Sequence, residues 1–411
     1  MTLQDYLVKY FPNGPIGEFE GKKVDIIPHF IDKFGVNVKN VGNLYLFKYD
    51  QLLVKFTIPL TKECRGHIYQ YINGKWSRVC NAMDKFWNYD EGFSPIFIES
   101  NFQSYIKQIE LKTKEDGSLI HLYWLEDQQK WNISTSGSIV CFNVGDSSLT
   151  FEDLFYKTLN QDIDEFTSKL DKNYTYIFEL CSTLNQIVSM YNNDRIYLLN
   201  VRHTQYGTYL PIHSIAKSVN LWIPPSIFLY QLDIKTKNDM IIWVENNCKD
   251  DNDCKNKEGF VGYINGTPSF KIKTNKYKFL HSFIGNNEKE TRNNIIDAYF
   301  NDSIDDVYND LHYSSKLFVE SLRLKVLNLL KDVNEATSNM VTMKFETQKD
   351  YALFVISNTP KMLNSFFFAN KEHILKNENV SEIFTKWIKH GYKKYEEYFV
   401  EYSSTFVISG L

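Results

Sequence analysis

The sequence lacks any apolar run long enough to cross a bilayer, and Met1–Tyr10 lacks the apolar stretch of a secretory signal. We therefore expect a cytoplasmic protein with no membrane partner. Cysteine is scarce, and its six positions (64, 80, 141, 181, 248 and 254) contain no CxxC pair. Cys248 and Cys254 are near enough in sequence to close a small loop, but free thiols in a reducing compartment are the expectation.

Several signatures of known enzyme classes are also missing. There is no GxxxxGKS/T phosphate loop, HExxH, GxSxG or EF-hand loop, which argues against P-loop kinases, zincins and α/β-hydrolases. The acidic run at 250–253 lacks the glycine that an EF-hand turn needs. Positive charge is not in excess, because the net charge is −4. Binding of nucleic acid would therefore depend on a local basic patch and on the salt concentration.

The pattern between about residues 40 and 275 is mainly that of short β-strands. With 411 residues the chain is longer than one hydrophobic core usually serves, so we expect two domains. Helices are predicted near 151–170 and 236–246, and an exposed polar loop at 246–257. Strands are predicted at 44–48, 52–58, 67–72, 109–111, 119–124, 131–134, 174–180, 196–201, 260–264 and 270–272.

Beyond residue 275 the apolar residues recur at spacings of three and four, which indicates amphipathic helices. One series runs from Val307 to Val333 and a second from Ile383 to Phe399. We place a domain boundary near residue 285. The sequence thus predicts an α+β protein, with a β-rich domain at 1–285 and a helical domain at 286–411.

A short string, Lys114-Glu115-Asp116-Gly117-Ser118-Leu119, lies between two predicted strands. A lysine amine attacks phosphorus or carbonyl carbon once it is deprotonated, and a neighbouring glycine lets the backbone approach a ligand. The amine is protonated at pH 7 unless burial or neighbouring cations lower its pKa. Taken alone, the string fits a surface β-turn with a solvated lysine equally well.

Further strings follow in a fixed order, each at a strand or a strand edge. They are Phe178-Glu179, Tyr197-Leu198-Leu199, Glu258-Gly259-Phe260 and Lys271-Ile272-Lys273. Together with the Lys114 string they resemble motifs I, III, IIIa, IV and V of the covalent nucleotidyltransferases, which include ATP-dependent ligases and mRNA capping enzymes. Two further elements lie upstream of Lys114, namely Glu63-Cys64-Arg65-Gly66 and Lys85-Phe86-Trp87-Asn88. They resemble the ECRG and KFFN elements of the RNA ligase 1 family typified by T-even phages.

This resemblance implies a fold and a reaction. The fold is a nucleotidyltransferase domain with ATP-grasp-like antiparallel sheets, followed by an all-helical C-terminal domain. The reaction is ATP-dependent RNA ligation, in which a lysyl-AMP enzyme adenylylates an RNA 5′-phosphate that a 3′-hydroxyl then attacks to form a phosphodiester. The implied cofactors are ATP and Mg²⁺ or Mn²⁺. The implied partners are RNA under repair, with broken tRNA as a candidate, and a separate end-healing kinase or phosphatase.

The resemblance also implies roles for residues. Lys114 is the nucleophile, Glu258 lies near a divalent ion, and Lys271 and Lys273 neutralise the α-phosphate and lower the pKa of Lys114. Arg65 and Lys85 hold the outer phosphates, and Glu179 lies near the ribose. The nucleotide-binding set is then Arg65, Lys85, Trp87, Gly117, Glu179 and Tyr197.

Plainer interpretations stay open for several of these residues. Glu179 could be a solvent-facing acid on its strand, and Arg65 an ordinary surface arginine. Tyr197 could stack on adenine or fill the core. Lys271 and Lys273, two residues apart, would share a strand face as a solvated pair.

Two features outside the five motifs are an acidic pair downstream and a serine at position 136. The resemblance implies metal-bound waters at an acidic pair, Asp305 and Asp306, although acids at a helix N-terminus explain the pair equally well. One position departs from the family type, which has a basic residue directly before Gly-Ser-Ile. Here Ser136 precedes Gly137-Ser138-Ile139, so the phosphate contact at this position is in doubt.

The C-terminal region offers one basic stripe at helical spacing, formed by Lys386, Lys389, His390 and Lys393. A solvated helix face is the plain interpretation, whereas the resemblance implies an RNA-docking or tRNA-docking surface.

Two other functions remain as alternatives. A DNA ligase or capping guanylyltransferase usually has a β-rich OB-fold after motif V, which the helical pattern at 286–411 disfavours. A non-catalytic RNA-binding protein would have no need of Lys114.

Overall fold

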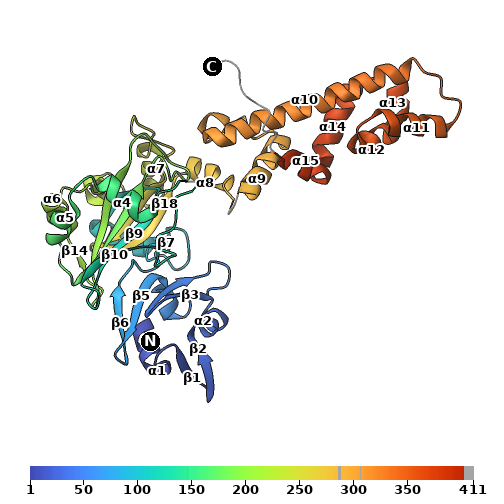
Figure 1. The fold of residues 1–411 in the computed structure, drawn as a ribbon. Helices are drawn as coiled ribbons and strands as arrows, with labels where there is room; N and C mark the ends of the chain where they lie inside the picture. The colour runs from blue at the N-terminus through green and yellow to red at the C-terminus, as the bar shows by residue number, and fades with distance from the viewer. Residues whose placement is uncertain (146, 286–287, 306, 402–411) are drawn as a thin grey trace. The chain divides into compact units, whose positions relative to one another are not determined.

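The computed structural model describes residues 1–145, 147–285, 288–305 and 307–401 (Figure 1). Contacts divide the chain into two compact units, Met1–Lys278 and Phe279–Leu411. The division falls within helix α8 (Asn275–Ser282). The sequence placed the domain boundary near residue 285, and the functions assigned to the two domains stay predictions.

The N-terminal part of the first unit is built on an antiparallel sheet of order β3-β4-β5-β6. Two helices share its core, α1 (Leu3–Tyr10) and α2 (Ile26–Phe34). Helix α2 begins after Asp25, whose side chain accepts from a backbone N–H, and ends at a left-handed glycine. The remaining elements are β1 (Ile16–Phe19), β2 (Lys22–Asp25), β3 (Val36–Val41), β4 (Leu44–Tyr49), β5 (Arg65–Ile72) and β6 (Lys75–Cys80).

One predicted strand in this region is wrong. Residues 52–58 form turns, and the 3-10 helix η1 (Pro59–Lys62) follows them. Leu52 is 93% exposed. The apolar residues that suggested the strand therefore have no sheet neighbour to pack against.

Two five-stranded sheets make up the rest of the first unit, with strand orders β10-β9-β11-β13-β14 and β15-β8-β17-β18-β7. Helices α4 (Phe151–Leu159) and α6 (Ile212–Ser218) cover one face of the first sheet. Helices α3 (Glu99–Tyr105) and α7 (Lys237–Asn247) pack on the second. The strands are β7 (Trp87–Asn88), β8 (Ile109–Lys114), β9 (Ser118–Leu125), β10 (Lys130–Thr135), β11 (Tyr174–Cys181), β13 (Arg195–His203), β14 (Tyr209–Leu210), β15 (Ser226–Phe228), β17 (Gly259–Ile264) and β18 (Thr267–Lys273).

The inner faces of these two sheets meet in a small apolar cluster. It is formed by side chains from both sheets and from the segment that precedes β7, namely Met83, Phe86, Leu119, Ile177, Leu199 and Val261. Apart from 52–58, each predicted strand falls within an observed strand. The predicted helix near 151–170 is two helices, α4 and α5 (Ile163–Ser168).

The predicted exposed loop at 246–257 needs correction. It includes the last residues of α7 and a short strand, β16 (Cys254–Lys255), which pairs with β12 (Met190–Tyr191). Cys254 and Asn256 are buried. All six cysteines are free, as expected.

Every regular element described after β18 is a helix, so the helical C-terminal part predicted from the sequence is confirmed. The long helix α10 buries side chains along its length, among them Leu322, Leu329 and Val333. No described helix combines the length and the apolar character that a membrane crossing requires. The helices are α9 (Glu288–Phe300), α10 (Tyr313–Val341), α11 (Gln348–Asn358), α12 (Asn364–Ala369), α13 (Lys371–Lys376), α14 (Val380–Gly391) and α15 (Glu396–Val400).

Candidate active site

Lys114 is the last residue of β8, and the turn that follows it leads into β9 of the other five-stranded sheet. The turn is not the solvated surface turn that remained as an alternative, because Asp116 within it is only 4% exposed. A Cβ atom at Gly117 would lie 2.3 Å from the carbonyl oxygen of Leu180. The glycine was expected to admit a ligand, but in this structure it lets the turn approach β11.

Strand register brings the distant motifs together. Lys114 pairs with Gly259, and Gly259 pairs with Lys273 on the next strand. Glu258, directly before Gly259, places Oε2 2.6 Å from Nζ of Lys114 and Oε1 2.9 Å from Nζ of Lys273. The Glu258 side chain is 3% exposed. Two partly exposed lysines and one buried carboxylate therefore form an ionic cluster at the end of three strands.

Carboxylates control the charge on Lys114. Burial by itself lowers its pKa, but Glu258 and Glu179 outweigh burial, so the pKa of Lys114 is raised. Burial by itself raises the pKa of Glu258, but the charges of Lys114 and Lys273 outweigh burial and hold this pKa below its ordinary value. The expectation that cationic neighbours keep the pKa of Lys114 low is wrong for the protein without nucleotide, because the amine contacts Glu258 directly.

The pKa of Lys271, in contrast to that of Lys114, is lowered. Burial, followed by the charges of Lys114 and Lys85, lowers the pKa of Lys271 to about 7. Among the residues that the structure describes, none forms an ion pair with Lys271. An anion that binds beside Lys271 would therefore stabilise the charged form of this amine.

Glu179 faces inward from β11 and is 8% exposed, so the solvent-facing alternative is wrong. Its Oε1 accepts a hydrogen bond of 3.0 Å from the backbone N–H of Gly117. Burial raises the pKa of Glu179 to about 7, although Lys114 acts against this shift. The carboxylate thus lies beside the turn that carries the nucleophile candidate.

Asp116 anchors this turn, a role that the sequence analysis missed. Its Oδ2 accepts from the backbone N–H groups of Val188 and Ser189 at 2.9 and 2.8 Å. Its Oδ1 accepts from the hydroxyl of Tyr277 at 2.8 Å. The only signal in the sequence was its place in the Lys114 string, since all three partners lie more than seventy residues away.

A cavity of about 730 Å³ includes Lys271 in its lining and brings together several other predicted residues. The Arg65 guanidinium stacks 4.8 Å from the Phe86 ring, and its Nη1 is buried without a hydrogen-bond partner in the described part of the chain. Nζ of Lys85 lies 5.0 Å from the Trp87 ring. Other lining residues are Lys48, Tyr49, Gln51, Phe56, Asn88, Glu91, Gly92, Phe93, Leu119, Ser136 and Lys271.

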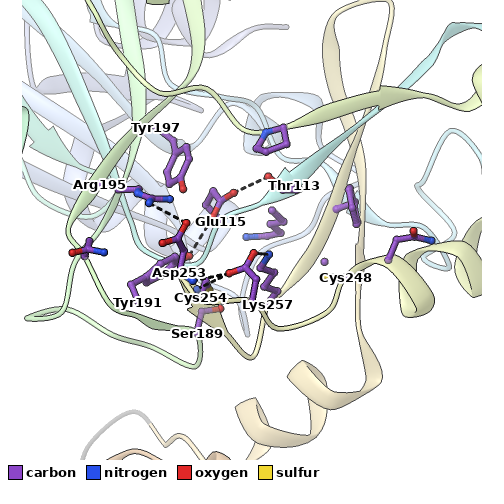
Figure 2. A pocket seen from close by; sticks show the side chains of 17 residues that line it. Thr113, Glu115, Ser189, Tyr191, Arg195, Tyr197, Cys248, Asp253, Cys254 and Lys257 are labelled. Atoms are coloured by element: carbon purple, nitrogen blue, oxygen red, sulfur yellow. Dashed lines mark hydrogen bonds and ion pairs between the residues drawn. The ribbon is translucent and has the colours of Figure 1, made fainter.

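A smaller cavity of about 220 Å³ includes Lys114 and Tyr197 in its lining. Figure 2 shows Tyr197, Arg195, Glu115 and Asp253 pointing toward one another around it. Arg195 and Asp253 form an ion pair of 3.1 Å. Tyr197 is 7% exposed and belongs to a buried cluster, so it fills the core and lines the cavity at the same time.

The model of a protein family described as RNA ligase matches residues 63–279, which is more than half of the chain. The chain belongs to the RNA ligase family. The matched region contains the two five-stranded sheets and the ionic cluster, and it confirms the resemblance on which the site was predicted.

Individual relatives match over shorter parts. The RNA ligase of Rhodothermus phage RM378 is 27% identical over 222 residues, 48% of this chain and 48% of the relative. A proposed bifunctional polynucleotide kinase/RNA ligase of Autographa californica nuclear polyhedrosis virus is 27% identical over 286 residues, 65% of this chain and 38% of the relative. The chain thus spans about half or less of the length of these curated relatives.

Among the solved structures that match this chain at low sequence identity are structures of RNA ligases. An archaeal ATP-dependent RNA ligase has 12% identity and a TM-score of 0.43, over 80% of this chain and 85% of that chain. A mutant of the Naegleria gruberi RNA ligase, solved with ATP and Mn, has 14% identity and a TM-score of 0.36, over 67% of this chain and 81% of that chain.

Outside the region matched by the RNA ligase family, those predicted residues that the structure describes have intramolecular partners. Asp305 pairs with Arg323 at 2.6 Å and is 80% exposed, and Asp306 lies outside the described residues. Lys386 pairs with Glu382 at 2.6 Å, Lys389 with Asp302, and Lys393 with Asp297 at 3.9 Å. These ion pairs offset the positive charge of the basic stripe. A metal role for Asp305 and Asp306 and RNA docking at the stripe stay predictions.

Proposed function

We propose that this protein is an ATP-dependent RNA ligase whose nucleophile is Nζ of Lys114. The observation that carries the proposal is the ionic cluster of Lys114, Glu258 and Lys273. Lys114 also lines the cavity that contains Tyr197, and Lys271, two residues before Lys273, lines the larger cavity together with three other cations. A triphosphate nucleotide needs such an arrangement, with a pocket for the base, an amine at the α-phosphate and cations for the outer phosphates.

The proposed reaction is the one that the resemblance to RNA ligases implies. The neutral amine of Lys114 attacks the α-phosphorus of ATP, a P–N bond forms, and the bond to the bridging oxygen breaks to release pyrophosphate. An oxygen of the RNA 5′-phosphate then takes the AMP group and frees the lysine. Finally, the RNA 3′-hydroxyl attacks that 5′-phosphate, a phosphodiester forms and AMP leaves.

The chain's residues act mainly by position and charge. Lys271 and Lys273 neutralise charge at the α-phosphate, and Arg65 and Lys85 hold the outer phosphates. Glu179, fixed by the Gly117 N–H, orients the ribose. Lys114 must lose a proton before it attacks, because in the nucleotide-free protein Glu258 holds it as an ammonium.

A divalent ion fits this site only as a companion of the nucleotide. The described residues contain no group of three or more His, Cys, Asp or Glu suited to a metal, and Glu258 contacts two lysines. Mg²⁺ is commonly held by one or two carboxylates together with substrate phosphates and water, so Glu258 is the residue that would hold it. When bound, such an ion neutralises phosphate charge.

We further propose RNA with broken ends, including tRNA, as the substrate. The Autographa relative carries a proposed polynucleotide kinase beside its ligase, which supports a kinase as the end-healing partner. Six free cysteines fit a reducing compartment such as the cytoplasm.

Transfer of label tests the proposal. The protein is incubated with ATP labelled at the α-phosphate, with Mg²⁺ or Mn²⁺, and separated on a denaturing gel. We expect an acid-labile label that is absent in Lys114→Ala and retained in Lys130→Ala, a control on the exposed start of β10. Label from GTP instead of ATP would indicate capping chemistry, and no label at all would indicate a binding protein. RNA and DNA ends offered to the labelled protein then identify the substrate.

A further inference from the structure

The larger cavity carries an unbalanced positive charge. Four cations line it, Lys48, Arg65, Lys85 and Lys271, and within the described part of the chain none of them forms an ion pair. The one carboxylate in the lining, Glu91, accepts hydrogen bonds from the backbone and side chain of Asn88 at 3.3 and 2.6 Å. Such a cavity is complementary to a ligand with several negative charges.

Lys48 is the member of this group that no sequence motif identifies. It lies near the end of β4, and the register of the sheet pairs it with Arg65 on β5. Like charges directly opposite each other on neighbouring strands destabilise a sheet. Burial lowers the pKa of Lys48 first, and the charges of Lys39 and Arg65 lower it further. Lys48 therefore lowers stability unless an anion lies between it and Arg65.

The direction of the Lys48 side chain accounts for the departure at Ser136. Nζ of Lys48 lies 3.0 Å from the place that a Cβ atom on Gly137 would take. Ser136, directly before that glycine, lines the same cavity as Lys48. The RNA ligase 1 family type has a basic residue where this chain has Ser136. A cation from β4 thus lies next to Gly137 and lines the same cavity as position 136, where the family type has its basic residue.

We propose that Lys48 binds the outer phosphates of ATP and supplies, from a different strand, the positive charge that position 136 lacks. This inference rests on the proposed function. Lys48 acts on the phosphates beyond the α-phosphate, because it lies with Arg65 and Lys85 in the larger cavity and not in the smaller cavity that Lys114 lines. Its loss should weaken the binding of ATP but not of AMP.

Binding of nucleotides that cannot react tests this assignment. The affinity of α,β-methylene ATP and of AMP is measured by calorimetry for the unmodified protein and for Lys48→Ser. We expect the affinity for the ATP analogue to fall about tenfold, the size of one charge-assisted hydrogen bond, and the affinity for AMP to stay unchanged. Lys39→Ser is the matched control, since Lys39 lies on β3 of the same sheet but outside the cavity lining.

A second experiment moves the positive charge from position 48 to position 136. Lys48→Ser combined with Ser136→Lys should restore most of the lost affinity for the ATP analogue. Equal affinity in Lys48→Ser and the unmodified protein would overturn the inference. So would an equal loss for ATP analogue and AMP, which would indicate a structural role, or a double variant with no recovery. If the unmodified protein neither binds the analogue nor labels Lys114, the proposed ligase function itself fails.

Discussion

Nζ of Lys114 lies 2.6 Å from Oε2 of Glu258, although 144 positions separate the two residues in the chain. The contact keeps the amine charged and therefore unreactive in the absence of nucleotide. If Lys114 is the nucleophile, as we propose, the first chemical step begins with the loss or neutralisation of this ion pair. The proposed function therefore couples nucleotide binding and activation of Lys114 through one carboxylate.

Removing one member of this pair should cost stability. Glu258→Gln leaves two lysines without their carboxylate, and breaking a buried ion pair costs about 3–5 kcal/mol. Lys114→Met combined with Glu258→Gln should cost less than the sum of the two single changes. Urea denaturation of the three variants measures this, and strictly additive losses would contradict a direct interaction.

Binding of α,β-methylene ATP, with which Lys114 does not react, should be accompanied by uptake of a proton above pH 7. The pKa of Lys271 is about 7 without nucleotide, so at pH 8 this amine is mostly neutral. Phosphate favours the charged amine and raises its pKa, so the complex binds a proton that the free protein does not. At pH 6 the amine is already charged and the uptake should vanish. Calorimetry at pH 8 in buffers of different ionisation enthalpy measures the uptake, which Lys271→Met should abolish.

Gly117→Ala should impair both folding and adenylylation. The added methyl group would lie 2.3 Å from the Leu180 carbonyl oxygen, so the turn that carries Lys114 must move away from β11. Overpacking of this kind costs about 1–3 kcal/mol, and labelling of Lys114 should fall at least about tenfold. Gly391→Ala is the control, since a Cβ atom there meets nothing within 4 Å. Normal labelling in Gly117→Ala would show that the position of the turn does not matter.

Asp116→Ala should destabilise the protein more than Tyr277→Phe. The first change leaves the buried N–H groups of Val188 and Ser189 without their acceptor, at about 1–3 kcal/mol for each unsatisfied group. The second removes a single hydroxyl, at about 1 kcal/mol. Thermal unfolding of the two variants gives the order, and a larger loss in Tyr277→Phe would be inconsistent with Asp116 as the anchor.

Much of the fold was predictable because the signals are local. Alternation of apolar residues located the strands that carry Glu179 and Lys271, and three-and-four spacing located the C-terminal helices. The false strand at 52–58 shows the limit of such signals. An apolar run becomes a strand only where a neighbouring strand is available, and pairing is a property of the whole sheet.

The electrostatics of the site were not predictable in the same way. Motif order indicated that Lys114, Glu258, Lys271 and Lys273 belong together, but not which lysine the carboxylate would contact. That depends on a register that pairs both Lys114 and Lys273 with Gly259. Lys48 carried no signal at all, because only the pairing of β4 with β5 places it opposite Arg65.

The hydrogen bond from Tyr277 to Asp116 sets a limit on how the protein can be shortened. Tyr277 lies on α8, the helix within which the first unit ends. A fragment cut just after the motif V lysines would keep every predicted contact to the nucleotide and still lose an anchor of the loop that carries Lys114. The smallest fragment able to charge itself with AMP should therefore extend through α8.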